Sequence, residues 1–278
     1  MRRVIGFDCD GDALVGTLDA AEGSTGLLTV SGGNEIRSGA YAGQAAMAGL
    51  FATTGVPVFR YDRRGIGDSE GLNAGFDGSA QDIAAALAAF RKAAPHVTRI
   101  VAFGNCDAAS ALALYHGGLD IDALILANPW VIEAAALRDA PTPPSAAAIR
   151  SRYWARIKNP RSLIDLLSGK IDLRKLAGGL ASASRRDEVS GLAKRIADAL
   201  THTTRPVHLL IARRDTTAMA FKGAWHDDVF KGARERANIG IEICDTASHS
   251  FADARAKAWL MERVGAVLVI KLHADTWS

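Results

Sequence analysis

Cys106 is the residue whose surroundings point most directly to chemistry. It lies in the run Gly-Asn-Cys-Asp-Ala at 104–108, between a short apolar stretch and an alanine-rich stretch. A nucleophile on a sharp strand-to-helix turn needs small residues two positions before and two positions after it, and Gly104 and Ala108 meet that need. The start of a helix favours a thiolate and offers N–H groups to an anion. The run therefore predicts a nucleophilic thiolate at Cys106, against the alternative of a small packed cysteine at a strand end.

A thiolate nucleophile needs a base, and the base needs an orienting carboxylate. His249 follows the apolar run 241–243, so we expect it in a loop at the carboxyl edge of the sheet, where parallel sheets place their sites. Asp215 follows the apolar run 207–211 and precedes His249 by 34 residues. This order of nucleophile, acid and base predicts that Asp215 orients His249. The alternatives are a loop histidine without a catalytic role and an aspartate that only caps the next helix.

The tetrahedral intermediate of acyl transfer needs N–H donors for its oxyanion. One donor in such an elbow is the residue after the nucleophile, here Asp107, and the other comes from a loop after an earlier strand. The run Ser-Gly-Gly-Asn at 31–34 is the candidate loop, because glycines let the backbone approach a substrate closely. We expect Gly33 and Asp107 to be the backbone donors, with Asn34 as a side-chain contributor.

A second glycine-rich run, Tyr-Asp-Arg-Arg-Gly-Ile-Gly-Asp-Ser-Glu-Gly at 61–71, follows another apolar stretch. A loop that cradles phosphate is one functional interpretation of this run. No Gly-Lys-Ser or Gly-Lys-Thr follows it, and residues 72–76 do not start a helix. We therefore favour a tight structural turn.

Short apolar runs alternate with longer alanine-rich amphipathic stretches along most of the chain. The predicted strands are 27–30, 57–61, 99–103, 123–127, 207–211 and 241–243, and the predicted helices are 40–54, 78–94, 107–117, 217–235 and 251–271. This alternation predicts an α/β fold with a mostly parallel central sheet flanked by helices on both faces. The runs 3–9 and 12–19 meet at an Asp-Gly-Asp turn, which predicts an additional antiparallel hairpin.

The alternation stops between residues 132 and 205. This stretch contains the proline-rich run 140–144, followed by helical segments and no convincing strand. We expect it to be a helical cap inserted into one core made of 1–131 and 206–278. Residues 145–204 hold 12 Lys and Arg against 5 Asp and Glu, so the cap would suit an anionic substrate or partner. A solvated charged helix face is the alternative interpretation of that excess.

The composition excludes several classes of protein. Hydrophobic residues make up 49% of the 278 residues and charged residues 23%, which is typical of a globular protein. No run approaches the ~18 uninterrupted apolar residues that a membrane span needs. The net charge of +3 is too small to indicate nucleic-acid binding. Three cysteines without a CxxC pair suit a reducing compartment, so we expect a soluble cytoplasmic protein, and no metal or cofactor motif is visible.

Together these motifs resemble those of the α/β-hydrolase superfamily. The turn at 62–69, the cysteine elbow, and Asp215 and His249 occur in the superfamily's order. Within the superfamily, the run Gly-Asn-Cys-Asp-Ala-Ala-Ser at 104–110 is similar to the elbow of the hydrolases associated with the exosortase A system of bacterial exopolysaccharide loci. The resemblance implies an α/β-hydrolase fold and a cysteine hydrolase in a polysaccharide-export context, without naming a substrate.

The sequence therefore predicts hydrolysis of an ester or thioester, with a small-molecule or carrier-bound acyl group as the substrate. An acyltransferase that passes the acyl group to a sugar hydroxyl would use the same three residues, so this alternative stays open. A catalytically inactive fold that serves as a binding subunit is the alternative from another class of function. It predicts that Cys106 is no more reactive than Cys9 or Cys244, which lack the elbow context.

Overall fold

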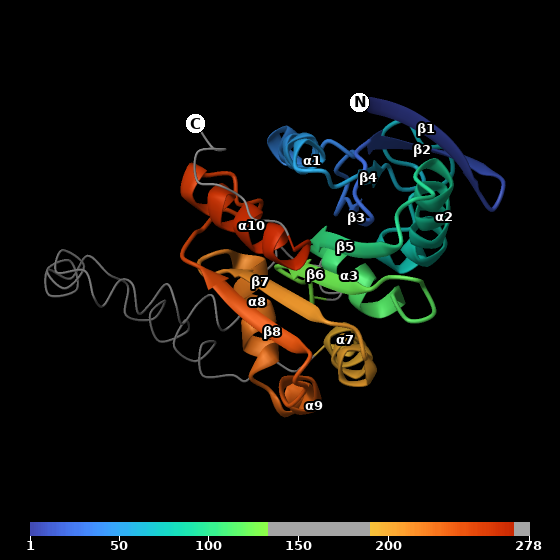
Figure 1. Cartoon of the computed structure of the whole chain (residues 1–278). Coiled ribbons are helices and arrows are strands. Elements are labelled where there is room, and N and C mark those ends of the chain that lie inside the picture. Colours follow the sequence, from blue (N-terminus) through green and yellow to red (C-terminus); the bar gives the residue numbers. More distant parts are fainter. Residues whose placement is uncertain (133–189, 270–278) are drawn as a thin grey trace, which may run out of the picture.

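An eight-stranded sheet forms the centre of the computed structural model, which describes residues 1–132 and 190–269 (Figure 1). The strand order is β1-β2-β4-β3-β5-β6-β7-β8. β2 pairs antiparallel with β1 and β4, and the remaining neighbours are parallel, so the predicted hairpin and mostly parallel sheet are confirmed. The strands are β1 Arg2–Cys9, β2 Asp12–Asp19, β3 Thr25–Val30, β4 Val58–Tyr61, β5 Arg99–Asn105, β6 Ala123–Ala127, β7 Val207–Ala212 and β8 Ile239–Cys244.

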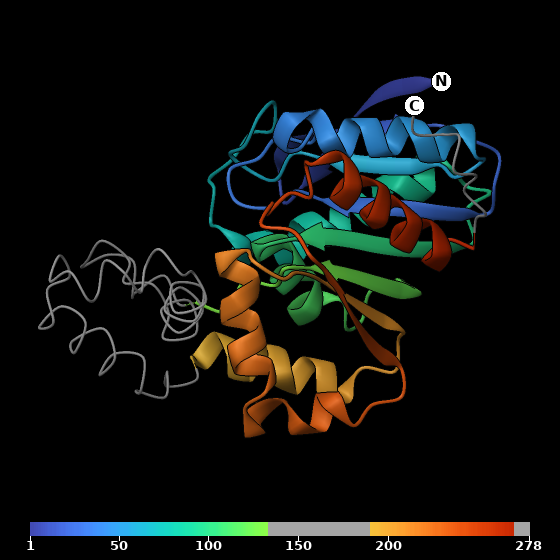
Figure 2. The ribbon, with the colours of Figure 1, turned by 90° about the vertical axis from the view of Figure 1, so that its left-hand side faces the viewer.

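Helices cover both faces of this sheet (Figure 2). α1 and α10 pack on one face, and α2, α3, α7 and α8 pack on the other. The α-helices are α1 Gly43–Thr53, α2 Ser79–Ala93, α3 Asp107–Tyr115, α7 Gly191–His202, α8 Thr216–Trp225, α9 Lys231–Arg234 and α10 Ala254–Val267, and the 3-10 helices are η1 Ala40–Ala42, η2 Phe76–Gly78 and η4 Asp228–Phe230. This is the α/β-hydrolase architecture that the sequence predicts.

The two helical layers explain why the central strands are apolar at nearly every position. In β5, Ile100 and Ala102 point into the core under α2 and α3, whereas Val101 and Phe103 point into the core under α1 and α10. Successive side chains of a strand alternate between faces, so a strand covered on both faces needs an apolar residue at each step. The same requirement makes these runs recognisable in the sequence.

The predicted helix 217–235 is wrong as a continuous element. α8 ends at Trp225, and the Asp227 carboxylate then accepts the Val229 N–H at 3.2 Å at the start of η4. This break brings the ring of Phe230 to within 5.4 Å of the Trp225 ring and 5.8 Å of the Phe221 ring, measured between centroids. Packing of these three aromatic rings and the aspartate cap outweigh the helical propensity of the run.

Most of the predicted cap, residues 133–189, lies outside the described residues. At its carboxyl end, α7 packs against the core, with Leu192, Ile196 and Leu200 buried among residues of the α2 and α3 layer. The Ser190 hydroxyl accepts the Ala193 N–H at 3.0 Å and starts this helix. None of the helices in residues 1–132 and 190–269 is long and apolar enough to cross a membrane.

Candidate active site

Cys106 occupies a strained turn between β5 and α3. Its φ of 63° and ψ of −128° are rare for a residue with a side chain, because the Cβ crowds the backbone there. The Cys106 N–H donates to the Ala127 carbonyl of β6 at 3.0 Å, which holds the turn against the sheet. A Cβ at Gly104 would lie 2.8 Å from the backbone of Ala108, so the turn closes only with a glycine at this position. Cys106 therefore stands at an elbow of the predicted geometry.

His249 and Asp215 meet at the same edge of the sheet. His249 lies in the loop after β8, and its Nδ1 is 3.0 Å from Oδ2 of Asp215, which follows β7. The same Asp215 oxygen accepts the Ala218 N–H at 2.9 Å and caps α8. Asp215 is buried, with 7% of its surface exposed. Capping of α8 and orientation of His249 are therefore compatible roles for Asp215, because the same carboxylate does both.

The pKa of His249 is raised from 6.5 to about 10. The hydrogen bond with Asp215 is the largest cause, a side-chain hydrogen bond with Cys106 is the next, and burial opposes both. Because Nδ1 faces Asp215, Nε2 is the ring nitrogen left for Cys106. The histidine is therefore an imidazolium at neutral pH, placed between a carboxylate and a sulfur.

The predicted oxyanion donors are close together, but one of them is already engaged. The Gly33 N–H donates to Oδ1 of Asp107 at 2.6 Å, and the buried Arg63 guanidinium binds the Gly33 carbonyl and lies 3.5 Å from Oδ2 of Asp107. In the part of the chain that the structure describes, the Asp107 N–H has no acceptor. The Asn34 side chain accepts a hydrogen bond from Asn73 at 3.0 Å, which holds it toward the neighbouring loop. An oxyanion would have to replace the Asp107 carboxylate at Gly33.

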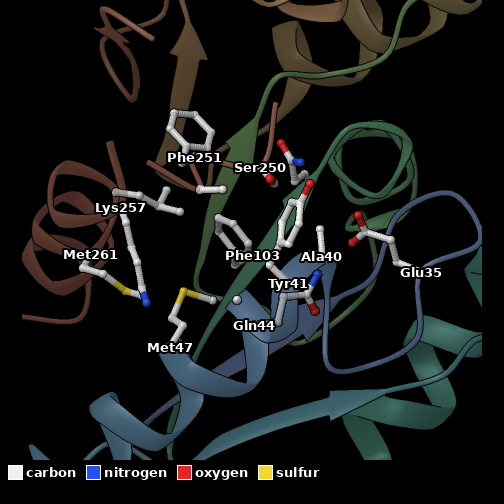
Figure 3. A pocket seen from close by; sticks show the side chains of 14 residues that line it. Glu35, Ala40, Tyr41, Gln44, Met47, Phe103, Ser250, Phe251, Lys257 and Met261 are labelled. Atoms are coloured by element: carbon white, nitrogen blue, oxygen red, sulfur yellow. The ribbon is translucent and has the colours of Figure 1, made fainter. Parts of the chain in front are cut away.

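A pocket opens beside the histidine loop, between α1, α10 and the loop after β3 (Figure 3). Asn105, which precedes Cys106, and Ser250, which follows His249, form part of its wall. Cys106 and His249 are not among the described residues that line it, so the pocket lies next to these two residues rather than around them. The remaining wall combines apolar and polar side chains: the larger apolar ones are Met47, Phe103, Phe251, Leu260 and Met261, and the polar ones are Glu35, Tyr41, Gln44 and Lys257.

Glu35, in the wall of this pocket, interacts electrostatically with His249 and Asp107. Burial raises the pKa of Glu35, while a hydrogen bond from the Ala40 N–H and the positive charge of His249 act in the opposite direction. The negative charge of Asp107 also raises it. Figure 3 places Glu35 and Lys257 on opposite sides of the pocket. A group bound between them would therefore lie between a carboxylate and an ammonium.

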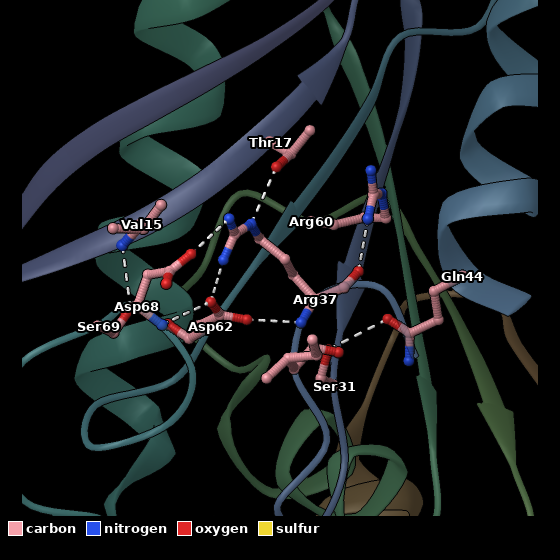
Figure 4. A network of polar contacts seen from close by, with 10 residues as sticks. Val15, Thr17, Ser31, Arg37, Gln44, Arg60, Asp62, Asp68 and Ser69 are labelled. Atoms are coloured by element: carbon pink, nitrogen blue, oxygen red, sulfur yellow. Dashed lines mark hydrogen bonds and ion pairs between the residues drawn. The ribbon is translucent and has the colours of Figure 1, made fainter. Parts of the chain in front are cut away.

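The glycine-rich turn after β4 supports the loop that carries Gly33 (Figure 4). Asp62 is fully buried, accepts the Arg37 N–H at 2.5 Å and forms an ion pair with the Arg37 guanidinium. It also accepts the Asp68 N–H at 3.2 Å, and Arg60 donates to the Arg37 carbonyl at 2.6 Å. Through these contacts the turn holds the neighbouring loop in place. This supports a structural role for the turn rather than a phosphate-binding role.

Several residues around the site were not predicted from the sequence. They are Glu35, Arg63, Asn105 and Asn128, and each interacts with a residue far away in the chain, Glu35 through charge and the other three through hydrogen bonds. A sequence signal does exist for Asn105 and Asn128, since both stand at the carboxyl end of a predicted strand, where parallel sheets gather their functional groups.

Residues 25–251 match the family described as serine aminopeptidase, S33. The chain belongs to this family. S33 proteins are α/β hydrolases, so the chain is a hydrolase of that superfamily. The family description names a serine, whereas this member carries Cys106 in the elbow.

Solved structures of other hydrolases share the fold of this S33 member. An esterase of Pyrococcus furiosus has 15% sequence identity and a TM-score of 0.64, over 97% of this chain and 91% of its own. A proline iminopeptidase of Mycobacterium smegmatis has 16% identity and a TM-score of 0.57, over 96% and 99%. An esterase of Exiguobacterium antarcticum has 15% identity and a TM-score of 0.59, over 95% and 99%. At such low identities, the structural similarity shows a common fold and nothing more. No curated protein matches this sequence.

The surroundings of the three cysteines predict selective alkylation. Burial, followed by the charge of Asp82, raises the pKa of Cys9 to about 11, and burial raises the pKa of Cys244. Cys106 is partly exposed, and its interaction with His249 contributes to the raised pKa of that imidazole. We expect iodoacetamide at pH 7 to modify Cys106 first, as measured by peptide mass analysis over time. Equal labelling of Cys9 or Cys244 in the folded protein would contradict this expectation, and Cys106→Ala should remove the fast phase.

The ion pairs of Arg37 predict that loss of Asp62 destabilises the protein more than loss of Asp68. Asp62→Ala removes the acceptor of the Arg37 N–H and the buried carboxylate of the ion pair with the Arg37 guanidinium, and should lower the free energy of unfolding by about 3 kcal/mol. Asp68→Ala removes a carboxylate that is 67% exposed and also binds Arg37, so it should cost less than about 1 kcal/mol. Urea unfolding of both variants measures the difference, and similar losses would show that Asp62 is not the anchor.

Proposed function

We propose that this S33 hydrolase cleaves esters or thioesters with Cys106 as nucleophile, His249 as acid and base, and Asp215 as the orienting carboxylate. The observation that carries the proposal is the position of His249, which is hydrogen-bonded to Asp215 through Nδ1 and is close enough to Cys106, at a strained elbow, for the sulfur to raise its pKa. An imidazolium next to a sulfur stabilises a thiolate, which is the reactive form of cysteine.

The first half-reaction forms an acyl-enzyme. The Cys106 thiolate attacks the carbonyl carbon, a C–S bond forms, and the electron pair of the carbonyl moves to its oxygen. The Asp107 N–H binds this oxyanion, and the Gly33 N–H joins it once the Asp107 carboxylate has turned away. The intermediate collapses with cleavage of the ester or thioester bond, and Nε2–H of His249 protonates the departing alcohol or thiol.

The second half-reaction restores the enzyme. Neutral His249 removes a proton from water as its oxygen attacks the thioester carbonyl, and the same N–H groups hold the new oxyanion. Collapse breaks the C–S bond, releases the carboxylic acid and leaves a thiolate beside an imidazolium. Asp215 keeps the ring in one orientation through both halves and stabilises its positive charge.

The pocket beside the triad suits the acyl part of the substrate. Its apolar wall of methionine, leucine and phenylalanine side chains would bury a hydrocarbon chain, and its position next to Asn105 and Ser250 puts it near the nucleophile. The esterases among the structural neighbours support ester cleavage. The elbow sequence favours a place in the exosortase-associated group and hence an acyl group from exopolysaccharide metabolism, small or carrier-bound.

The triad predicts the behaviour of two single variants. Wild-type protein should hydrolyse p-nitrophenyl esters or acyl thioesters, and both Cys106→Ala and His249→Ala should abolish turnover. The rates for acyl chains of increasing length are measured from the absorbance of the released p-nitrophenol or of the free thiol after reaction with a chromogenic reagent. Turnover that survives Cys106→Ala would exclude the proposed nucleophile. No turnover in the wild type, together with an unreactive Cys106, would favour a binding subunit, and turnover that needs a sugar acceptor would identify an acyltransferase.

Two substitutions of Asp215 separate its roles. Asp215→Asn keeps an oxygen that can cap α8 but removes the negative charge that stabilises His249, so kcat should fall by ~10²- to 10⁴-fold with little change in thermal midpoint. Asp215→Ala removes the cap as well and should lower the free energy of unfolding by about a further 1 kcal/mol. An unchanged kcat in Asp215→Asn, with a stability loss only in Asp215→Ala, would mean that Asp215 acts only as a cap.

A further inference from the structure

Two carboxamides, the buried Asn128 and the partly exposed Asn105, bind the backbone of the residue that carries the proposed catalytic imidazole. Asn128 donates from Nδ2 to the His249 carbonyl at 2.9 Å, and Asn105 donates from its own Nδ2 to the same carbonyl at 3.2 Å. The Asn128 Nδ2 also donates to Oδ1 of Asn105 at 3.1 Å. The two side chains thus hold each other and the backbone oxygen of His249 in one small network.

Burial and hydrogen bonds hold the Asn128 side chain in one orientation. It follows β6 and is fully buried, with a φ of 43° in the left-handed region that asparagine tolerates better than most residues. Its Oδ1 accepts the Ala212 N–H at the end of β7 at 2.8 Å, and its backbone N–H donates to the Leu210 carbonyl at 2.9 Å. Both polar atoms of the carboxamide are therefore used, and its donor can point only toward His249 and Asn105.

Asn105 extends this network to the nucleophile. It is the last residue of β5 and is covalently joined to Cys106. The network therefore connects the carboxyl ends of β5, β6 and β7 with the loop after β8. His249 is held twice, through its carbonyl by the two asparagines and through Nδ1 by Asp215. Two restraints on one residue fix the distance and direction of Nε2 relative to the sulfur.

We propose that Asn105 and Asn128 are positioning residues that keep His249 aligned with Cys106. The inference rests on the proposed function and adds to it the groups that preorganise the triad. Neither asparagine touches the reacting atoms, so their effect passes through His249. A misplacement of a catalytic group by about 1 Å can lower a rate by ~10²-fold, which gives these hydrogen bonds a measurable effect.

Two substitutions of Asn128 test the role in different ways. Asn128→Asp keeps the acceptor for the Ala212 N–H but replaces the donor with an oxygen facing the His249 carbonyl. Asn128→Gly removes the whole side chain while permitting the positive φ. Asn238→Asp is the matched control, because its Nδ2 also binds two backbone carbonyls, those of Thr203 at 3.2 Å and Arg205 at 2.7 Å, in another part of the fold.

The experiment is a double-mutant cycle with His249→Ala, read out by the rate of Cys106 alkylation and by kcat and KM on one p-nitrophenyl ester. We expect both Asn128 variants to lower kcat about 10- to 100-fold with KM changed less than about threefold, and to slow alkylation at pH 7. In the His249→Ala background the same substitutions should leave the alkylation rate unchanged. Asn238→Asp should leave kcat and alkylation unchanged, at a temperature where all variants are folded.

Two results would overturn the inference about the asparagines and leave the proposed roles of Cys106, His249 and Asp215 unaffected. If the Asn128 substitutions slow alkylation equally with and without His249, their effect does not pass through the imidazole. If they leave kcat at the wild-type value, the hydrogen bonds do not position the base. A wild type that turns over neither esters nor thioesters rejects the proposed function instead, and in that case the alkylation cycle still measures the coupling between Asn128 and His249.

Discussion

The left-handed backbone of Cys106 is the constraint around which the rest of the site is arranged. A side chain in this region of φ and ψ is unfavourable by roughly 1 to 3 kcal/mol, so the surrounding contacts must hold it there. The Cys106 N–H bond to Ala127 and the close approach of Gly104 to Ala108 do so. The strain lifts the sulfur out of the sheet and starts α3 directly after it. Each other functional group then lies on a neighbouring strand end or the loop that follows it.

Charge is distributed around this elbow in two layers. Next to the sulfur, His249 and Asp215 form a pair whose hydrogen bond raises the pKa of the imidazole to about 10. Further away, the Asp62 carboxylate holds Arg37 and with it the loop that carries Gly33. The pair of His249 and Asp215 determines the protonation state of the imidazole, and the pair of Asp62 and Arg37 determines the shape of the loop. A buried carboxylate serves in both, because it can accept several hydrogen bonds at once.

The parts of the site that could be predicted are those encoded in short runs of sequence. The elbow at Cys106 requires small residues nearby, and apolar strands covered on both faces leave a clear pattern, so both were recognisable. The contacts of Asn105 and Asn128 with the His249 carbonyl, and of Asp107 with the Gly33 N–H, join residues more than 70 positions apart. Nothing in the local sequence fixes such pairings, since they follow from the order of strands in the sheet. The break between α8 and η4 was missed for a related reason, because three aromatic rings select it by packing.

The Asp107 carboxylate on the Gly33 N–H has a consequence for the proposed hydrolysis. A carboxylate at this position has the charge and shape of the acid released at the end of each cycle. Being covalently attached, it returns to the amide at a high effective concentration once the oxyanion has gone. In the proposed mechanism, a released acid would have to compete with this tethered carboxylate for the Gly33 N–H.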